Sequence, residues 1–143
     1  MSELGVPGNS LEYEFDDIAL NVEGVPGELL DEICQREKLR PLHGKWKKLD
    51  FEIASRLLMD ALRFDLAYTS FERMPVEKAK SFHDQILSRV NTNTCTCYTN
   101  WNESPWSGSG GGSWTGVTTS VIDLVIVLMD RQKVVFTYFE GDD

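Results

Sequence analysis

The sequence VIDLVIVLMDRQKVVFTYFE, residues 121–140, contains two apolar runs separated by a short polar segment. Both runs are rich in β-branched and aromatic residues, which favours strands. Neither reaches the roughly 20 apolar residues that a membrane-spanning helix needs. The first run becomes apolar on both faces toward its end, as is typical of a strand covered on both sides. We therefore expect two buried strands joined by a turn at residues 130–132.

One charged residue, Asp123, interrupts the first of these runs. A carboxylate inside an apolar strand must be paired, lie exposed at the start of the strand, or have a shifted pKa. The sequence leaves these alternatives open.

A third strand is predicted upstream, in the threonine-rich segment NTCTCYTNW, residues 93–101. Its period of two places Cys95, Cys97, Thr99 and Trp101 on one face. Three consecutive strands with short or flexible links favour an antiparallel meander.

The first half of the chain predicts strand and then helix. Leu11, Tyr13 and Phe15 alternate with Glu12 and Glu14, and a second alternation follows at Ile18, Leu20 and Val22. Two copies of GVPG, residues 5–8 and 24–27, are interpreted as turns. Helical spacing then recurs in three apolar sets. These sets are Leu29, Leu30, Ile33 and Cys34, closed by Arg40-Pro41; Ala54, Leu57, Leu58, Ala61, Leu62 and Phe64 after an Asp50 N-cap; and Val76, Ala79, Phe82, Ile86, Leu87 and Val90 after Pro75 at the first helical position.

Together these patterns predict the α+β class in a single domain, residues 1–143. We expect one or more N-terminal strands, followed by three helices packed on one face of a C-terminal, mostly antiparallel β-meander.

Charge and cysteine content narrow the function classes. The 143 residues carry a net charge of −9, and residues 1–32 hold acids but no lysine or arginine. Such a balance argues against direct nucleic-acid binding, because cationic contacts to phosphate supply most of that affinity. The N-terminus shows no secretory pattern, and the odd count of three cysteines argues against a disulfide framework. We expect a cytoplasmic protein that does not associate with membranes.

A glycine-rich loop, PWSGSGGGSWTG at residues 105–116, lies between tryptophans. It lacks the lysine of a phosphate-binding loop, the third glycine of a dinucleotide fingerprint and the first or last glycine of a nucleophile elbow. It suits a recognition finger that presents indoles outward. The alternatives are a hairpin tip whose tryptophans cover the edge of the core, and an engineered linker.

Metal and acid–base chemistry have weak support. Cys95 and Cys97 form one close pair, whereas structural zinc sites usually show two. No metal or cofactor is therefore expected, and His83 is interpreted as a hydrogen-bonded histidine at the core margin. The basic segment around Trp46, with Arg40, His43, Lys45, Lys47 and Lys48, is interpreted as a solvated linker lying against the acidic N-terminal strand.

These observations favour binding over catalysis. We expect a small acidic inhibitor, similar in role to an immunity protein or an antitoxin, that neutralises a basic protein partner such as a nuclease toxin. Its acids would steer the encounter and its indoles would fill a pocket. The expected partner-binding residues are Trp101, Trp106, Trp114, Glu12, Glu14, Asp16 and Asp17.

Two other functions stay open, as does the oligomeric state. One is a structural or assembly subunit of a larger, phage-like complex that associates through exposed sheet edges. The other, with less support, is a small metal-binding enzyme that uses His83, Cys95, Cys97 and Asp123.

Overall fold

The computed structural model describes residues 9–14, 26–107 and 112–141. These residues form a five-stranded antiparallel sheet with the strand order β1-β5-β4-β3-β2. The strands are β1 (Asn9–Glu14), β2 (Lys47–Leu49), β3 (Thr96–Thr99), β4 (Ile122–Met129) and β5 (Lys133–Gly141). The helices are α1 (Pro26–Arg36), α2 (Phe51–Arg63) and α3 (Val76–Leu87), with a short 3-10 helix η2 (Thr92–Thr94) before β3. The predicted α+β class and the meander β3-β4-β5 are confirmed.

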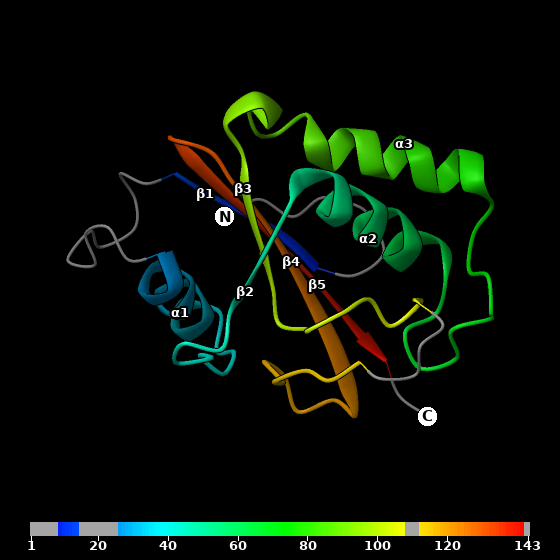
Figure 1. The fold of residues 1–143 in the computed structure, drawn as a ribbon, viewed down its shortest axis with the longest axis horizontal. Coiled ribbons are helices and arrows are strands. Elements are labelled where there is room, and N and C mark those ends of the chain that lie inside the picture. The colour runs from blue at the N-terminus through cyan, green and yellow to red at the C-terminus, as the bar shows by residue number, and fades with distance from the viewer. Residues whose placement is uncertain (1–8, 15–25, 108–111, 142–143) are drawn as a thin grey trace.

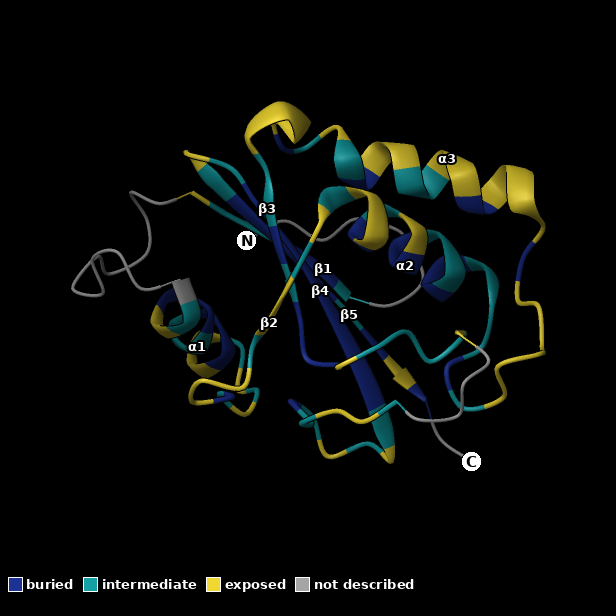
Figure 2. Cartoon of the chain, viewed as in Figure 1, coloured by how far each residue is buried: buried dark blue, intermediate teal, exposed yellow. Residues whose placement is uncertain are grey.

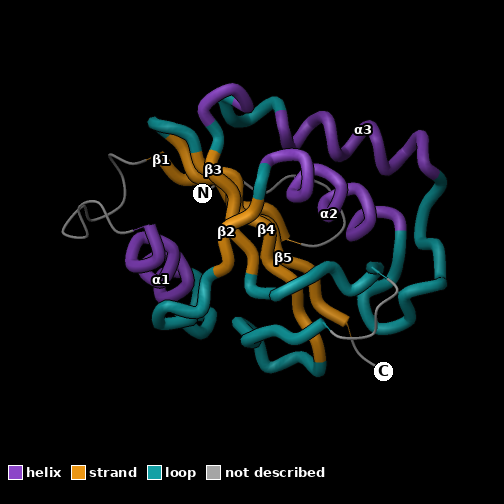
Figure 3. The backbone as a smooth tube through the Cα atoms, viewed as in Figure 1, coloured by secondary structure: helices purple, strands orange, loops and turns teal. Residues whose placement is uncertain are grey.

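The helices cover both faces of the sheet (Figures 1 and 3). The buried residues of α2 and α3 pack in one cluster, and those of α1 pack in a second cluster on the opposite face. The expectation that all three helices share one face is therefore wrong. Side chains alternate between the faces along β4, so Leu124, Ile126 and Leu128 join the first cluster while Val125 and Val127 join the second. This alternation explains why β4 is apolar on both faces, as Figure 2 shows by its burial.

The first helix ends earlier than predicted, at Arg36 rather than at Arg40-Pro41. Lys38 adopts a positive φ of 59°, and the Leu39 N–H donates to the Cys34 carbonyl over 2.7 Å. The Lys38 N–H also donates to the Gln35 carbonyl, so the helix closes in a Schellman motif with lysine where glycine is usual.

The other two helices follow the predicted pattern closely. Asp50 occupies the N-cap of α2 as expected, although its side chain makes no capping hydrogen bond. Pro75 is the N-cap of α3, one residue before the predicted position. Neither these helices nor α1 combines the length and the apolar character of a bilayer-crossing segment.

Two features of the N-terminal half differ from expectation, and others fall outside the described residues. Lys47 and Lys48, interpreted as linker, form with Leu49 the edge strand β2, which pairs with β3. Of the second GVPG, Pro26 and Gly27 belong to α1 rather than to a turn. The first GVPG, Phe15 and the alternation at Ile18, Leu20 and Val22 lie outside the described residues.

Candidate functional site

Trp101, Trp106 and Trp114 gather where β3 ends and β4 begins, and we call these three residues the tryptophan corner. The corner is fastened by Asp123, whose side chain is fully buried in β4. Its carboxylate accepts hydrogen bonds from the Val117 N–H (3.1 Å), the Thr118 N–H (2.9 Å), the Thr118 hydroxyl (2.8 Å) and the Asn100 amide (2.8 Å). The sequence left open how the Asp123 carboxylate is accommodated in an apolar strand. In the structure it is paired with uncharged hydrogen-bond donors. The buried carboxylate holds the returning limb of the loop against the start of β4.

The two limbs of the loop meet at a bridge between Trp101 and Trp114. The Asn102 N–H donates to the Ser113 carbonyl over 3.0 Å, and the Thr115 N–H donates to the Asn100 carbonyl over 3.1 Å. The Trp101 and Trp114 rings stack with centroids 4.6 Å apart and an interplanar angle of 15°. The prediction that the glycine-rich loop joins two paired segments is confirmed for residues 100–102 and 113–115. Residues 108–111 lie outside the described part of the chain.

The three indoles differ in exposure, so the prediction that all of them point outward is wrong. Trp101 is 4% exposed, and its Nε1–H donates to the Asp123 carbonyl over 2.7 Å. Trp106 is half-buried, and its Nε1–H donates to the Asp65 carbonyl over 3.3 Å. Trp114 is 40% exposed and covers Trp101. Trp101 therefore belongs to the core edge, and Trp114 is the only one of the three whose side chain is exposed.

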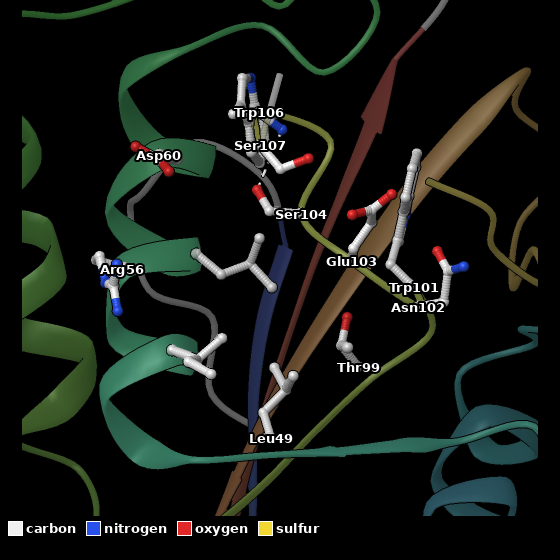
Figure 4. A pocket seen from close by; sticks show the side chains of 12 residues that line it. Leu49, Arg56, Asp60, Thr99, Trp101, Asn102, Glu103, Ser104, Trp106 and Ser107 are labelled. Carbon is white, nitrogen blue, oxygen red and sulfur yellow. Dashed lines mark hydrogen bonds between the residues drawn. The ribbon is translucent and has the colours of Figure 1, made fainter. Parts of the chain in front are cut away.

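A cavity of about 510 Å³ lies between α2 and residues 99–107 (Figure 4). Its apolar lining comes from Leu49, Ile53, Leu57, Trp101 and Trp106. Its charged lining residues are Arg56, Asp60 and Glu103. In Figure 4 the ring of Trp101 is seen edge-on, with one face turned across the cavity toward α2. A concave, largely apolar space with a few polar groups is the usual form of a ligand site.

One polar group in the cavity lining lacks a partner within the described residues, and one carboxylate there is partly desolvated. Thr99 is 1% exposed, and its hydroxyl makes no hydrogen bond there. The Asp60 carboxylate is half-buried and forms no ion pair or hydrogen bond with any described side chain. Burial raises the pKa of Asp60 above its usual range, and Arg63 and Arg56 only partly offset this rise. A buried hydroxyl without a partner calls for an explanation, and carboxylates with a raised pKa are often found at functional sites.

The predicted acidic residues lie elsewhere. Glu12 pairs with Arg89 (3.2 Å) and contacts Lys133 (3.9 Å), and Glu14 lies opposite Lys133 in the β1–β5 register. Both are thus near the β4–β5 turn, at the opposite end of the strands from Trp101. The structure does not join Glu12 and Glu14 to the tryptophans in one surface. Asp16 and Asp17 lie outside the described residues.

The basic segment packs against α1 rather than against the N-terminal strand. The Asp31 carboxylate of α1 accepts hydrogen bonds from the Trp46 Nε1–H (2.9 Å), the Leu42 N–H (2.9 Å) and the His43 N–H (3.2 Å). The side chains of Arg40, Lys45, Lys47 and Lys48 are exposed. None of these four forms an ion pair with a carboxylate of the described residues.

Apart from the pair Cys95 and Cys97, the candidate metal ligands are not brought together. His83 contacts the Ser55 hydroxyl (2.8 Å) and the Asp84 carboxylate (3.0 Å), whereas Asp123 lies in the corner. Cys34 belongs to the α1 cluster on the other side of the sheet from Cys97. Within the described part of the chain, no three His, Cys, Asp or Glu residues are placed to hold a metal ion.

The cysteine pair itself forms as predicted, with the Cys95 and Cys97 sulfurs 3.7 Å apart. The hydrogen bond between them lowers the pKa of Cys95, and that hydrogen bond together with burial raises the pKa of Cys97. Burial raises the pKa of Cys34 to about 12. Cys34 and Cys97 are therefore neutral, buried thiols at neutral pH.

Comparison with known proteins finds no matching family model, no matching curated protein and no matching solved structure. The sequence did indicate one part of the cavity, since its alternation placed Thr99 on the face shared by Cys97 and Trp101. It did not indicate Asp60 or Ile53, because only the packing of α2 beside β3 creates the space that they line.

Proposed function

We propose that the chain is an acidic binding protein that neutralises a basic protein partner, in the manner of an immunity protein or an antitoxin. The observation that carries the proposal is an exposed apolar rim at the tryptophan corner. Trp114 is 40% exposed, and Tyr68, Phe71 and Val121 are 58%, 63% and 59% exposed. Exposed aromatic residues are common at protein interfaces, in which aromatic anchors provide much of the binding energy.

These four side chains belong to segments that meet at one end of the sheet, which is the lower end in Figure 1. Val121 directly precedes β4, and Trp114 lies in the limb that Asp123 fastens there. Gly141, at the end of β5, packs closely on Leu66 and Ala67 of the loop that carries Tyr68 and Phe71. The same loop accepts the hydrogen bond from Trp106 through the Asp65 carbonyl. The rim therefore lies on a framework that the sheet positions.

Charge favours a basic partner. The chain carries a net charge of −9, which arises in residues 1–32, and the cavity lining contributes two carboxylates, Asp60 and Glu103, and one guanidinium, Arg56. A negative field of this kind attracts a cationic surface and accelerates encounter, while the apolar rim slows dissociation. The predicted mechanism is retained: Asp60 and Glu103 take the steering role in place of Glu12 and Glu14, and the exposed rim residues act as the anchors.

Capture from an extract of the native host tests this proposal. The tagged full-length chain should retain a basic protein in stoichiometric amount at low salt, and less of it at roughly 0.5 M NaCl, at which surface charges are strongly screened. Trp114→Ala and Phe71→Ala should each reduce capture, because both truncate exposed rim side chains.

Val76→Ala is the matched control, since Val76 is similarly exposed (42%) but lies at the start of α3. Capture that is equal for Trp114→Ala and Val76→Ala, or a captured protein that is acidic, would contradict the proposal. Light scattering that shows a stable oligomer of the chain, dissociated by Trp114→Ala, would instead favour the assembly-subunit alternative.

A further inference from the structure

We propose that Ser55, His83 and Asp84 form a catalytic triad that hydrolyses small acyl esters. This activity goes beyond the proposed binding of a basic protein and does not depend on it. The three side chains come from α2 and α3, which lie side by side on one face of the sheet (Figures 1 and 3). A serine and a carboxylate joined through one imidazole are the arrangement that activates a serine nucleophile.

The hydrogen bonds run in the order that this chemistry needs. Ser55 Oγ lies 2.8 Å from His83 Nε2, and His83 Nδ1 lies 3.0 Å from Asp84 Oδ1. An ionised carboxylate can only accept hydrogen bonds, so Asp84 requires a proton on Nδ1. The neutral imidazole then carries no proton on Nε2, and this nitrogen accepts from the Ser55 hydroxyl. The general base and the nucleophile are therefore already in contact.

Asp84 has the charge that this role requires. The hydrogen bond from His83 holds the pKa of Asp84 below its usual range, and the hydrogen bond from Lys80 (3.2 Å) adds to this effect. Lys80 lies one helical turn before Asp84 on α3. The carboxylate is thus ionised at neutral pH and is held on two sides, which makes Asp84 the positioning residue of the triad.

The triad lies at the surface rather than in the core. Ser55 is half-buried, and the side chains of His83 and Asp84 are 12% and 56% exposed. None of the three belongs to the buried residues of either core cluster. A substrate can therefore approach from the solvent side of the seam between α2 and α3.

Apolar side chains flank the triad along this seam. Phe51 and Met59 lie one turn before and one turn after Ser55 on α2, so they share its face. Leu87 lies one turn after His83 on α3. All three pack against the first core cluster and stay partly exposed. They offer apolar contacts to a short acyl chain.

The reaction follows from the two hydrogen bonds. Ser55 Oγ attacks the acyl carbonyl while its proton passes to His83 Nε2. The bond to the leaving oxygen then breaks, and His83 Nε2 gives the proton to that oxygen. Water attacks the acylated Ser55, His83 Nε2 takes a proton from the water and returns it to Ser55 Oγ, and the carboxylic acid leaves.

The helical setting narrows the class of ester. Ser55 and His83 both lie beyond the first turn of their helices, where the backbone N–H groups are used within the helix. These N–H groups are not free to stabilise an oxyanion, so the leaving group must itself be acidic. Aryl esters of short apolar acids meet this requirement and suit the apolar flank.

Hydrolysis of para-nitrophenyl butyrate by the full-length chain tests the activity. Ser55→Ala and His83→Ala should each lower the rate by about 10²–10⁴-fold, the usual contribution of a positioned base. The two losses should be similar, because the residues act as a unit. His43→Asn is the matched control, since His43 is exposed and is the other histidine of the chain. It should leave the rate unchanged.

A fluorophosphonate tests the nucleophile directly. Ser55 Oγ should attack phosphorus and expel fluoride, which leaves one covalent label that mass spectrometry maps to Ser55. The label should be lost in Ser55→Ala and His83→Ala. It should be retained in Ser81→Ala, which removes an exposed serine of α3.

Variants of Asp84 test its positioning role. Asp84→Asn should lower the rate by about tenfold or more, because an amide can donate to Nδ1 and leave the proton on Nε2. Asp84→Glu should recover part of the rate, because it restores the carboxylate. Lys80→Ala removes the ion pair but keeps the hydrogen bond to His83, so the rate should change by less than about threefold.

No label on the folded chain, or a rate that Ser55→Ala leaves unchanged, would overturn the proposal. Equal losses in His43→Asn and His83→Ala would do the same, because any exposed imidazole would then account for the hydrolysis. An equal rate for Asp84→Asn and the unaltered chain would overturn the role of Asp84. All of these measurements use the isolated chain, so they are independent of the capture of a basic protein.

Discussion

Asp123 shows how one residue determines the geometry of the candidate site. Burying a carboxylate in an apolar strand is unfavourable unless donors surround it. Here the donors are the backbone of Val117 and Thr118, the Thr118 hydroxyl and the Asn100 amide. The side-chain amide oxygen of Asn100 in turn accepts a hydrogen bond from the Val125 N–H over 2.8 Å. The same network thus joins β4 to both limbs of the loop and fixes the position of Trp101.

We predict that Asp123→Asn lowers the free energy of unfolding by about 2–4 kcal/mol, because the amide leaves at least one buried donor unpaired. Urea denaturation followed by tryptophan fluorescence measures the change. Glu140→Gln is the control, since Glu140 pairs with Asp123 in the β4–β5 register but is exposed, and it should cost less than ~0.5 kcal/mol. A similar loss in both variants would show that the network does not carry this stability.

At the scale of elements, the end of α1 is decided by conformation rather than by the proline that follows it. Lys38 occupies the left-handed region with φ of 59°, which is unfavourable for a residue with a β-carbon. The Schellman hydrogen bonds from Lys38 and Leu39 nevertheless close the helix there. The chain can then turn back so that Leu42, His43 and Trp46 hydrogen-bond to Asp31. This early ending gives room for β2 to join the sheet edge.

We predict that Lys38→Gly raises the free energy of unfolding by about 1 kcal/mol, because glycine adopts positive φ without steric cost. Thermal and urea unfolding of the two proteins would measure it. Lys45→Gly is the matched control: Lys45 is exposed and is not among the described non-glycine residues with positive φ, so glycine there should be neutral or destabilising. Stabilisation by both changes, or by neither, would refute this account of the helix end.

At the scale of the whole molecule, β4 and β5 couple two cores. Alternate residues of each strand face the α1 cluster and the α2–α3 cluster. Loosening either helix layer therefore exposes one face of the same two central strands. The ion pair from Glu12 to Arg89 adds a link from β1 to the residues that follow α3. We expect the two layers to unfold together, as small single domains usually do.

We predict that Leu30→Ala in α1 and Leu58→Ala in α2 each cost about 2–5 kcal/mol, the usual penalty for a buried leucine. Leu30 and Leu58 are 0% and 1% exposed, and they lie on opposite faces of the sheet. Far-ultraviolet circular dichroism and tryptophan fluorescence should show one coincident transition in both variants. Separated transitions in Leu30→Ala would mean that the α1 layer unfolds independently.

The sequence alone was sufficient for the types of the long elements, but not for the short edge strand β2. The apolar, β-branched runs at residues 121–140 predicted β4 and β5, and helical spacing predicted α1, α2 and α3, because these signals follow from local backbone geometry and side-chain preference. The alternation through Cys97, Thr99 and Trp101 also predicted which side chains share a face. The α+β class and the meander follow from these local patterns and from short connections.

Only the tertiary structure decided which face each helix covers, that residues 47–49 form an edge strand, and that Trp101 is buried while Trp114 is exposed. It also created the cavity, where Asp60 of α2 and Thr99 of β3 line one space although 39 positions separate them in the sequence. Hydrophobic periodicity shows which face of an element is buried. It does not identify the distant segment that covers this face. The choice is made by the free energy of packing the whole chain, in which contacts between remote segments add to or override each local preference.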